Sequence, residues 1–373
     1  MIYLDSAATS MLKPDGVTYA VVEAMSNMGS PGRGAHEAAM KAAGLCYECR
    51  RNLADLFRMK DESRVVFTFN ATHALNIAIA SLVKPGTRVL VSGYEHNSVM
   101  RPLRAHGAKV EVIRSALFDQ QAMLKAFALR LPKSDVAVFT YVSNVFGFIL
   151  PVEEMARLCR KMNKPFLIDA SQAAGVLPIA FDELGADFLA CPGHKALLGP
   201  QGTGVLLCKK DAVPLLYGGS GSDSRLPLMP EYLPDRLEAG THNVAGIAGL
   251  NAGVKYLLHQ GLDKIQAREQ EALELMVGEL LGCEELNLFY SSDKNVQCAV
   301  LSILPRDHNC ERLGEALAQA DVAVRTGLQC APSAHETAGT LDTGTVRLSF
   351  SPFNSRDELY AAAKMIKKFS KIS

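Results

Sequence analysis

The chain has 373 residues, enough for a large hydrophobic core and more than a single domain usually needs. Lys and Arg number 39, and Asp and Glu also number 39, so no net charge favours binding to nucleic acid or to an anionic membrane. No basic segment precedes an apolar run at the start, and no stretch reaches the roughly 18 apolar residues that span a bilayer. We therefore expect a cytoplasmic protein.

The cysteines point to the same kind of compartment. There are nine of them, and this odd number in a long chain favours free thiols over a disulfide framework. Cys46 and Cys49 form a CxxC pair inside a helical pattern that has no second cysteine pair and no histidine at ligand spacing. A structural zinc site needs four ligands, so we expect these two thiols to pack in the core and predict no metal site.

Strand-like and helix-like patterns alternate through the first part of the chain. The expected strands cover residues 64–69, 88–92, 109–114, 135–142, 165–169, 187–191 and 204–208, and the expected helices cover 72–83, 97–106, 120–131 and 151–162. This alternation predicts an α/β fold with a mostly parallel sheet, helices on both of its faces, and strands that are buried on both sides. In such sheets ligands bind beyond the carboxyl ends of the strands.

The pattern changes near residue 253, where a long amphipathic helix is expected to begin and to run to about residue 281. After it we expect strands near 286–290 and 297–304, a helix at 310–320, a strand at 322–325 and a last helix after 356. Strands beside fewer helices indicate a smaller α+β domain. We predict a large domain over residues 13–252, and a small domain over residues 253–373 that also includes residues 1–12.

Five short polar segments stand at or just after the expected strand ends. They are Asn70-Ala71-Thr72, Glu95-His96-Asn97-Ser98, Ser143-Asn144, Asp169-Ala170-Ser171-Gln172 and Gly193-His194-Lys195. Together they supply the groups that an aromatic aldehyde bearing a phosphate, pyridoxal 5′-phosphate (PLP), requires. Lys195 would be the nucleophilic amine once it is partly desolvated, and the alternative is an exposed surface lysine.

Each of the other groups has two interpretations. Asp169 could face a protonated pyridine nitrogen, or cap a helix. His96 could stack on the pyridine ring, or begin a helix or lie satisfied in the core. Thr72 stands where a helix N-terminus favours a phosphate, although an N-cap role is more common. Gln172 could reach the ring hydroxyl, or serve as a loop amide.

These residues resemble those of the class V aminotransferase group of fold-type I PLP enzymes, and within it the cysteine desulfurase and selenocysteine lyase branch. The motifs that carry the resemblance span essentially the whole length: YLDSAAT (3–9), SPGRG (30–34), EHN (95–97), SNV (143–145), DASQ (169–172), GHK (193–195), RLEAGT (236–241) and RTGLQCAP (325–332). The resemblance implies PLP fold type I, with a seven-stranded-type sheet sandwiched by helices.

The resemblance also implies the roles of the cofactor-binding residues. Lys195 would carry PLP as a Schiff base and move the α-proton, Asp169 would bind the pyridinium, and His96 would stack on the ring as a further catalytic residue. Gln172 would bond the phenolic oxygen. The phosphate would be bound by Ala71, Thr72 and His194 and by Thr241 of the neighbouring subunit. A site shared between subunits implies a homodimer.

On the substrate side, the resemblance implies that Asn144 and Arg347 bind the substrate carboxylate, a task for which a bidentate arginine is suited. Arg33 would line the entrance from the partner chain. Cys330 stands in a loop similar to the short persulfide loop of the SUF-type desulfurases. Its thiolate would attack the substrate sulfur, with Arg325 nearby to favour the ionised thiol. The alternative for Cys330 is a small buried residue.

The sequence thus predicts a cysteine desulfurase that converts L-cysteine to L-alanine and passes persulfide sulfur to an acceptor protein, for Fe–S cluster or related biosynthesis. Selenocysteine lyase activity on L-selenocysteine would use the same pocket. A transaminase or epimerase on the same fold is a further alternative, since fold alone does not set chemistry. Two residues depart from the family pattern. Pro192 replaces a hydroxyl residue and cannot donate a hydrogen bond to phosphate, and His73 replaces a frequent glutamate.

Overall fold

The computed structural model of the protein describes residues 1–32, 34–222 and 224–371. Its largest sheet has seven strands in the order β2-β8-β7-β6-β5-β3-β4. They are β2 (Val65–Thr68), β3 (Arg88–Ser92), β4 (Lys109–Ile113), β5 (Val136–Thr140), β6 (Phe166–Asp169), β7 (Phe188–Pro192) and β8 (Gly204–Cys208). Strands β3 to β7 are parallel, whereas β8 is antiparallel to both β2 and β7. The predicted mostly parallel sheet is confirmed.

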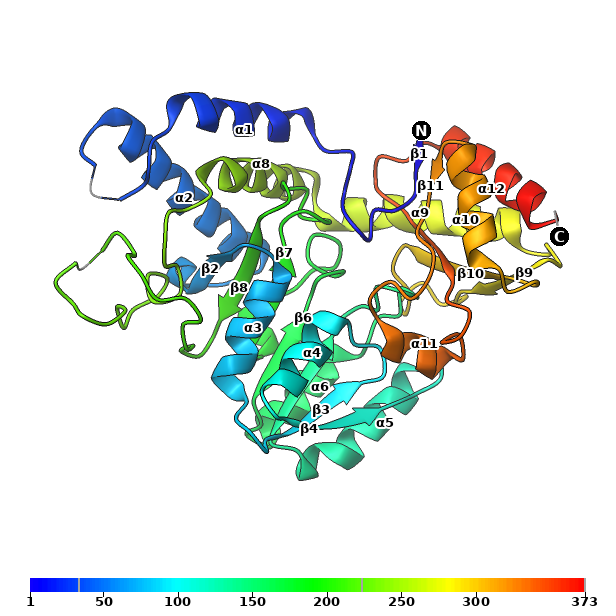
Figure 1. The fold of residues 1–373 in the computed structure, drawn as a ribbon, viewed down its shortest axis with the longest axis horizontal. Coiled ribbons are helices and arrows are strands. Elements are labelled where there is room, and N and C mark those ends of the chain that lie inside the picture. The colour runs from blue at the N-terminus through cyan, green and yellow to red at the C-terminus, as the bar shows by residue number, and fades with distance from the viewer. Residues whose placement is uncertain (33, 223, 372–373) are drawn as a thin grey trace.

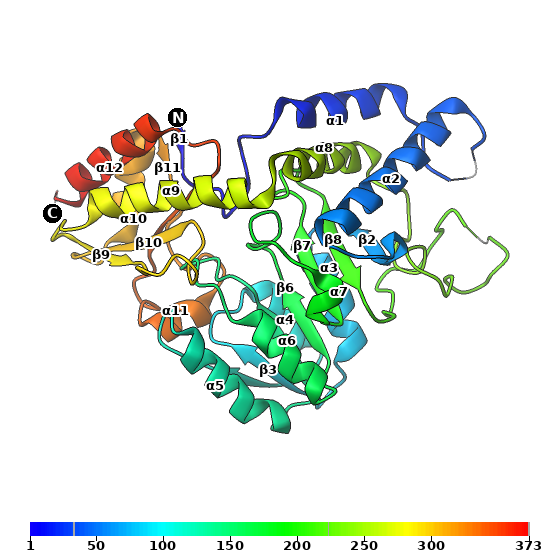
Figure 2. The ribbon, with the colours of Figure 1, turned by 180° about the vertical axis from the view of Figure 1, so that it is seen from behind.

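Helices cover both faces of this sheet (Figures 1 and 2). They are α1 (Asp15–Asn27), α2 (Glu37–Leu56), α3 (Ala71–Leu82), α4 (Asn97–Ala105), α5 (Gln120–Arg130), α6 (Val152–Lys161), α7 (Phe181–Leu184) and α8 (Val244–Gln260), with 3₁₀ turns at Glu62–Arg64 and Leu131–Lys133. Successive side chains of a strand point to opposite faces. Val136 and Val138 of β5 therefore pack with α3 and α4, whereas Ala137 and Phe139 pack with α5 and α6.

A second hydrophobic core lies beside the large sheet. It is built on a three-stranded antiparallel sheet in the order β12-β10-β9 and on the helices that pack against it. The elements are β9 (Leu286–Phe289), β10 (Val300–Pro305), β12 (Val346–Ser349), α9 (Leu262–Leu280), α10 (Cys310–Gln319) and α12 (Arg356–Ser370). Helix α11 (Pro332–Ala338) packs instead with the core of the large sheet, through Ala334. Strand β1 (Ile2–Tyr3) pairs with β11 (Val322–Ala323), and Leu4 joins this core. The domain division after residue 252 stays a prediction.

The single long helix expected over residues 253–281 is wrong. The structure has two helices, with Gly261 between the end of α8 and the start of α9. Gly261 has a φ of 82°, which glycine adopts at little cost, and this backbone geometry ends α8. The two helices then separate, because α8 packs on α1 and α2 and α9 packs on α12. Strand β12 and helix α11 are not among the elements that the sequence predicts.

Two kinds of feature are absent from the described residues. In that part of the chain no helix combines the length and the apolar character required to cross a bilayer. Nor do three or more His, Cys, Asp or Glu side chains gather there into a cluster that could hold a metal ion.

Candidate active site

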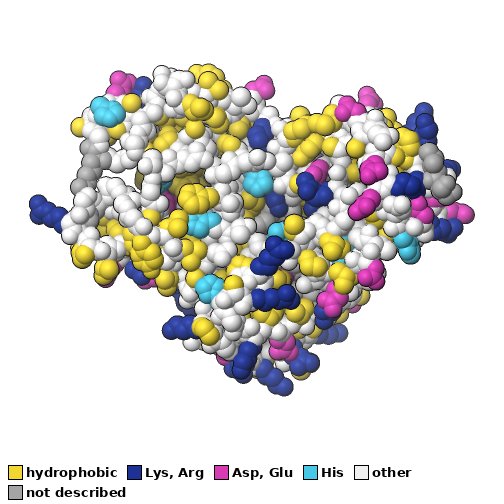
Figure 3. Space-filling model, in the orientation of Figure 1, with side chains coloured by type: hydrophobic (Ala, Val, Ile, Leu, Met, Phe, Trp, Pro, Cys, Tyr) yellow, Lys and Arg dark blue, Asp and Glu magenta, His cyan; other side chains and the backbone are white. Residues whose placement is uncertain are grey.

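A cavity of about 360 Å³ lies at the carboxyl ends of β5, β6 and β7. Its lining combines strand-end residues with residues that follow β11 and with Arg347 of β12. The predicted site residues on its wall are Ala71, Thr72, His96, Asn144, Asp169, Gln172, His194, Lys195, Arg325, Cys330 and Arg347. Figure 3 shows histidine and basic side chains near the middle of one face of the molecule. The structure therefore brings most of the predicted residues to one place.

Lys195 lies in the turn that follows β7. Gly193 leads into this turn, and a Cβ on it would lie 2.2 Å from Oγ1 of Thr203, so no side chain fits. The backbone N–H of Leu198 donates to the Lys195 carbonyl over 2.9 Å. Burial lowers the pKa of the Lys195 amine to about 8, although the nearby Asp169 carboxylate acts in the opposite direction. The amine is thus more readily unprotonated than an ordinary lysine, as a nucleophile requires.

Asp169 is the last residue of β6, and only 2% of it is exposed. Its Oδ1 accepts hydrogen bonds from the backbone N–H of Ser171, at 2.9 Å, and from the Ser171 hydroxyl. No described residue donates a hydrogen bond to Oδ2. Asp169 also lines the cavity, so Oδ2 is open to a bound partner. This oxygen therefore fits the protonated nitrogen of a pyridine ring.

His96 is the N-cap of α4, and its Nδ1 accepts a hydrogen bond from the backbone N–H of Ser98 at 3.0 Å. Burial lowers the pKa of the imidazole, with Asp169 acting in the opposite direction. Because Nδ1 is an acceptor, the neutral ring carries its proton on Nε2. A neutral aromatic ring on the cavity wall suits stacking against a flat cofactor.

Groups suited to a phosphate lie at the N-terminus of α3. Asn70 caps this helix by accepting the His73 N–H at 2.9 Å. The N–H groups of Ala71 and Thr72 follow it, and the first N–H groups of a helix have no acceptor inside the helix. His194 stands on the same cavity wall; burial lowers the pKa of its ring to about 4. Pro192, also on the wall, has no N–H to donate, as expected from the sequence.

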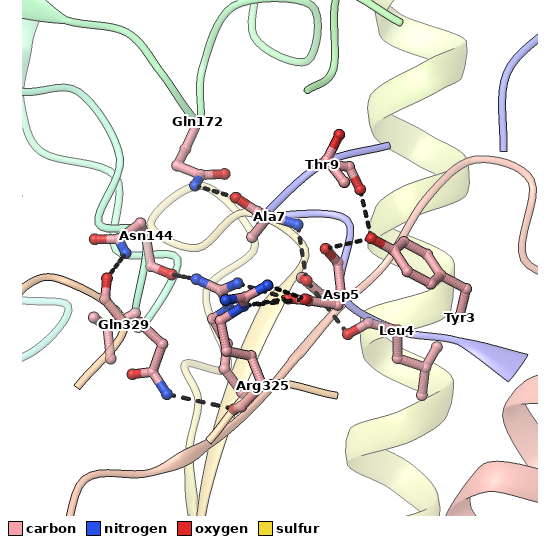
Figure 4. A network of polar contacts seen from close by, with 12 residues as sticks. Tyr3, Leu4, Asp5, Ala7, Thr9, Asn144, Gln172, Arg325 and Gln329 are labelled. Carbon is pink, nitrogen blue, oxygen red and sulfur yellow. Dashed lines mark hydrogen bonds and ion pairs between the residues drawn. The ribbon is translucent and has the colours of Figure 1, made fainter. Parts of the chain in front are cut away.

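These groups fit PLP. The cavity offers an amine of lowered pKa, a buried carboxylate oxygen without a donor, a flat aromatic side chain and a helix N-terminus. Gln172 also lines the cavity, and its amide donates to the carbonyl of Ala7 at 3.0 Å (Figure 4). PLP would thus be held by Lys195, Asp169 and the start of α3.

Two arginines and one aspartate form an ion cluster at one side of the cavity (Figure 4). Arg347 is 2% exposed, and its guanidinium donates to Oδ1 of Asp5 at 2.8 Å and to the Asn144 carbonyl at 3.0 Å. Arg325 donates to the same carboxylate, with its closest contact at 2.8 Å to Oδ2. The buried Nε of Arg347 has no hydrogen-bond partner. Arg325 and Arg347 both line the cavity, so the cluster presents cationic side chains to a bound anion.

Cys330 is the exposed cysteine of the chain; the other eight, all within the described residues, are buried or half-buried. It lies in the turn between β11 and α11, and its backbone carbonyl accepts the N–H of Asn97 at 2.8 Å. Cys330 lines the cavity together with Arg325 and Gln329 of the same segment. The alternative of a small buried core residue does not match this exposure.

Two residues that matter to this site carry no predicted role. Asp5 belongs to the motif at 3–9, but nothing in the local sequence reveals its arginine partners. Glu95 precedes His96, is fully buried, and accepts hydrogen bonds from the Ser92 hydroxyl at 2.5 Å and the Thr140 N–H at 2.9 Å. Burial raises the pKa of Glu95 to about 8, so this carboxyl is largely protonated at neutral pH. Its position directly before His96, which is predicted to stack on the cofactor, is the signal that could have singled it out.

Two predicted residues do not join the cavity. Thr241 lines a different cavity of about 140 Å³, together with Phe69, His73 and Glu238. Arg33 lies outside the described residues. The roles assigned to the individual site residues stay predictions.

The fold and the site define a PLP-dependent enzyme of fold type I. The sequence model described as "Aminotransferase class-V" matches residues 2–361, and the chain belongs to this family. The chain is 31% identical to a probable cysteine desulfurase of Pyrococcus abyssi, over 96% of this chain and 92% of that protein. It is 32% identical to a probable cysteine desulfurase of Haemophilus influenzae, over 97% of this chain and 84% of that protein.

Solved structures are similar over almost the whole chain. The apo cysteine desulfurase of Thermococcus onnurineus NA1 superposes with a TM-score of 0.91 at 29% identity, covering 99% of this chain and 94% of that one. The Escherichia coli cysteine desulfurase CsdA, solved as an S-sulfonic acid, has a TM-score of 0.85 at 26% identity, with the same coverage of both chains.

Proposed function

We propose that this enzyme is a cysteine desulfurase, which converts L-cysteine to L-alanine and retains the sulfur as a persulfide on Cys330. The position of Cys330 carries the proposal. This exposed thiol lines the same cavity as Lys195 and Arg347. An exposed thiol near cationic groups can act as a nucleophile, whereas most free cysteines are inert packing residues. The names of the relatives support the same activity.

The substrate carboxylate would bind Arg347. Arg347 lines the cavity, and a guanidinium binds a carboxylate through charge-assisted hydrogen bonds. Asn144 lines the cavity beside Arg347, and its carbonyl accepts a bond from the guanidinium at 3.0 Å. This arrangement would hold an amino acid with its carboxylate at the arginines and its amino group toward Lys195, which lines the same cavity.

When bound, PLP supplies an electron-withdrawing ring to the amino acid Cα, and Asp169 keeps the ring nitrogen protonated. The Lys195 amine takes the proton from Cα and holds it on Nζ. The Cys330 thiolate then attacks the substrate sulfur. A Cys330 Sγ–S bond forms while the substrate Cβ–S bond breaks, and its electron pair passes to the carbon skeleton. Protonation at Cβ and at Cα gives alanine.

Turnover of L-cysteine by the PLP-loaded enzyme tests this proposal. We expect alanine, and an adduct of about 32 Da, the mass of one sulfur atom, on Cys330 after a single turnover. In Cys330→Ser the adduct should disappear and the rate of alanine formation should fall by roughly 100-fold or more, since the nucleophile is lost. Mass spectrometry of the protein and an alanine assay measure the two effects.

Cys283→Ser is the matched control, because Cys283 is the half-buried cysteine of the chain and lies outside the cavity lining. This variant should keep both the adduct and the rate. Unchanged turnover in Cys330→Ser would contradict the proposal. Running L-selenocysteine in parallel ranks the two substrates, and a selenocysteine rate that does not depend on Cys330 would favour the lyase alternative.

We further propose that the enzyme is a homodimer of the SUF-type branch in the cytoplasm and that it passes its sulfur to an acceptor protein. Three observations support this. Thr241, which is expected to bind the phosphate in the neighbouring subunit, lines a cavity separate from the one that Lys195 lines. Tyr19 and Met25 of α1 are each 74% exposed, as apolar side chains at a subunit interface would be in a single chain. The free thiols of all nine cysteines suit a reducing compartment.

A further inference from the structure

The turn that carries Cys330 has an unusual backbone. Gln329 and Cys330 both have a left-handed conformation, with φ values of 41° and 58°. Residues with a Cβ adopt this conformation at a cost in free energy, and two such residues in succession are rare. The turn therefore keeps this shape only if contacts around it hold it there.

Some of those contacts are made by the backbone of the turn. The Gln329 carbonyl accepts a hydrogen bond from Nδ2 of Asn144 at 2.8 Å, and the Cys330 carbonyl accepts the N–H of Asn97 at 2.8 Å. Inside the turn, the N–H of Ala331 donates to the Leu328 carbonyl at 2.8 Å. These bonds tie the turn to the loop after β5 and to the start of α4.

The side chain of Gln329 makes the remaining contacts, and it is buried, with 8% exposed. Its Nε2 donates to the carbonyls of Thr345, at 3.0 Å, and Arg325, at 3.4 Å. Since both of these groups are acceptors, the amide nitrogen must face them. The amide oxygen Oε1 must then face the ring of His335, whose Nε2 lies 2.9 Å away.

This orientation determines the state of His335, which is fully buried on α11. Its Nε2 must carry the proton, because Oε1 of Gln329 can only accept. Its Nδ1 lies 2.8 Å from Oγ1 of Thr340 and accepts that hydroxyl proton. Burial lowers the pKa of the ring to about 4, so the ring stays neutral and the same tautomer persists at neutral pH. The bonds run in one direction, from Thr340 through His335 to Gln329.

We propose that His335 is a positioning residue for the Cys330 thiol. Through Gln329 it maintains the left-handed turn that presents the thiol to the cavity. His335 itself does not line the cavity, so it acts without contact with substrate or cofactor. The proposal rests on the proposed function, in which Cys330 accepts the sulfur.

Hydrogen exchange of the PLP-loaded enzyme tests the positioning directly, without turnover. In His335→Leu the amides of residues 328–331 should exchange about tenfold faster than in the wild type, since a buried hydrogen bond that supports the turn is lost. Peptides from the seven-stranded sheet should be unchanged. Gln offers an amide donor in place of Nε2, so His335→Gln should restore much of the protection. His259→Gln, an exposed histidine on α8, is the control and should match the wild type.

A second measurement connects the turn to sulfur transfer. The rate at which the persulfide appears on Cys330 in a single turnover should fall about tenfold in His335→Leu, while the KM for L-cysteine stays within about twofold. Gln329→Leu should show the same loss of rate; because Gln329 itself lines the cavity, its KM is not part of the test. The double variant should be no slower than the slower single variant, because the two residues act in one chain of bonds.

The proposal would be overturned if residues 328–331 of His335→Leu exchanged at the wild-type rate. It would also be overturned if the rate losses of the two single variants multiplied in the double variant, or if the KM of His335→Leu rose as much as its rate fell. If His335→Leu raises exchange throughout the chain, Thr340→Val is tested in its place, because it removes only the hydroxyl that donates to His335. Thr340→Val must then raise exchange at residues 328–331 alone. If wild-type Cys330 takes up no sulfur, the proposed function fails, and hydrogen exchange still decides whether His335 maintains the turn.

Discussion

Asp5 is the counter-ion of two guanidinium groups at the edge of the active-site cavity. Arg347 is almost fully buried and Arg325 is half exposed, yet both donate to the same carboxylate. Burial lowers the pKa of the Arg347 guanidinium, and the charge of Asp5 acts in the opposite direction. Without Asp5, a buried cation would have only a backbone carbonyl as its partner. The aspartate therefore makes a buried cation on the cavity wall compatible with a stable core.

Asp5→Asn should lower the stability of the protein markedly. Removing one partner of a buried ion pair leaves the other charge uncompensated, which typically costs about 3–5 kcal/mol of unfolding free energy. Urea denaturation of the purified variant measures the change. Asp321→Asn is the matched control, since its ion pair with the N-terminal amine is exposed and should contribute less than about 1 kcal/mol. Equal losses in the two variants would show that Asp5 has no special role.

At the scale of single residues, the sequence predicts those site residues that can be recognised from their position at a strand end. Lys195, Asp169 and His96 each follow a recognisable strand end, and the structure places them on one cavity wall. Asp5 and His335 are different, because their importance depends on partners that only the folded chain brings near. Asp5 pairs with Arg347, which is 342 positions away, and no periodicity or spacing in the sequence predicts such a contact.

Among the elements, Gly261 separates the two long helices. Its φ of 82° ends α8, and α9 begins at the next residue. The sequence pattern continues through it, which explains why one helix is expected there. Periodicity reports which residues are apolar, but a single glycine within an amphipathic pattern can be a tolerated helix residue or a break. Tertiary packing of α8 on α2 and of α9 on α12 decides between the two.

Gly261→Ala should destabilise the protein by about 1–3 kcal/mol, because alanine has a Cβ and is strained at this positive φ. Gly278→Ala, inside α9, should instead stabilise it by roughly 0.5–1 kcal/mol, since alanine favours a helix and a Cβ there meets nothing within 4 Å. Thermal unfolding of both variants gives the comparison. A stabilised Gly261→Ala protein would show that the backbone at this joint is not constrained.

For the whole molecule, the α/β class and the mostly parallel sheet follow from alternation of strand and helix patterns along the chain. The order of its strands does not, since β2 reaches its place beside β8 across a long stretch of sequence. Strand β12 and helix α11 also escape prediction, because each is short and is stabilised mainly by its neighbours. The second core in particular draws on both ends of the chain.

The proposed homodimer makes Thr241 a ligand of the neighbouring site. Sedimentation should give the mass of two chains, and Thr241→Ala should weaken PLP binding by about tenfold through the loss of one phosphate hydrogen bond. PLP release, followed by absorbance, measures this change. Thr343→Ala, in the second core region and outside both cavities, should bind PLP as the wild type does. A monomeric mass at full activity would contradict the shared site.

The ion pair between Asp5 and Arg347 joins the start of the chain to its last strand, and both termini lie at the same end of the molecule (Figure 1). During synthesis Asp5 leaves the ribosome early, whereas Arg347 leaves it almost last. Residues 65–208, which form the sheet and carry Asp169 and Lys195, emerge well before Arg347 does. On the proposed function, a growing chain can hold the lysine and the aspartate of its cofactor site while it still lacks the arginine that would bind the substrate carboxylate. Turnover of L-cysteine would then begin only after the chain is finished.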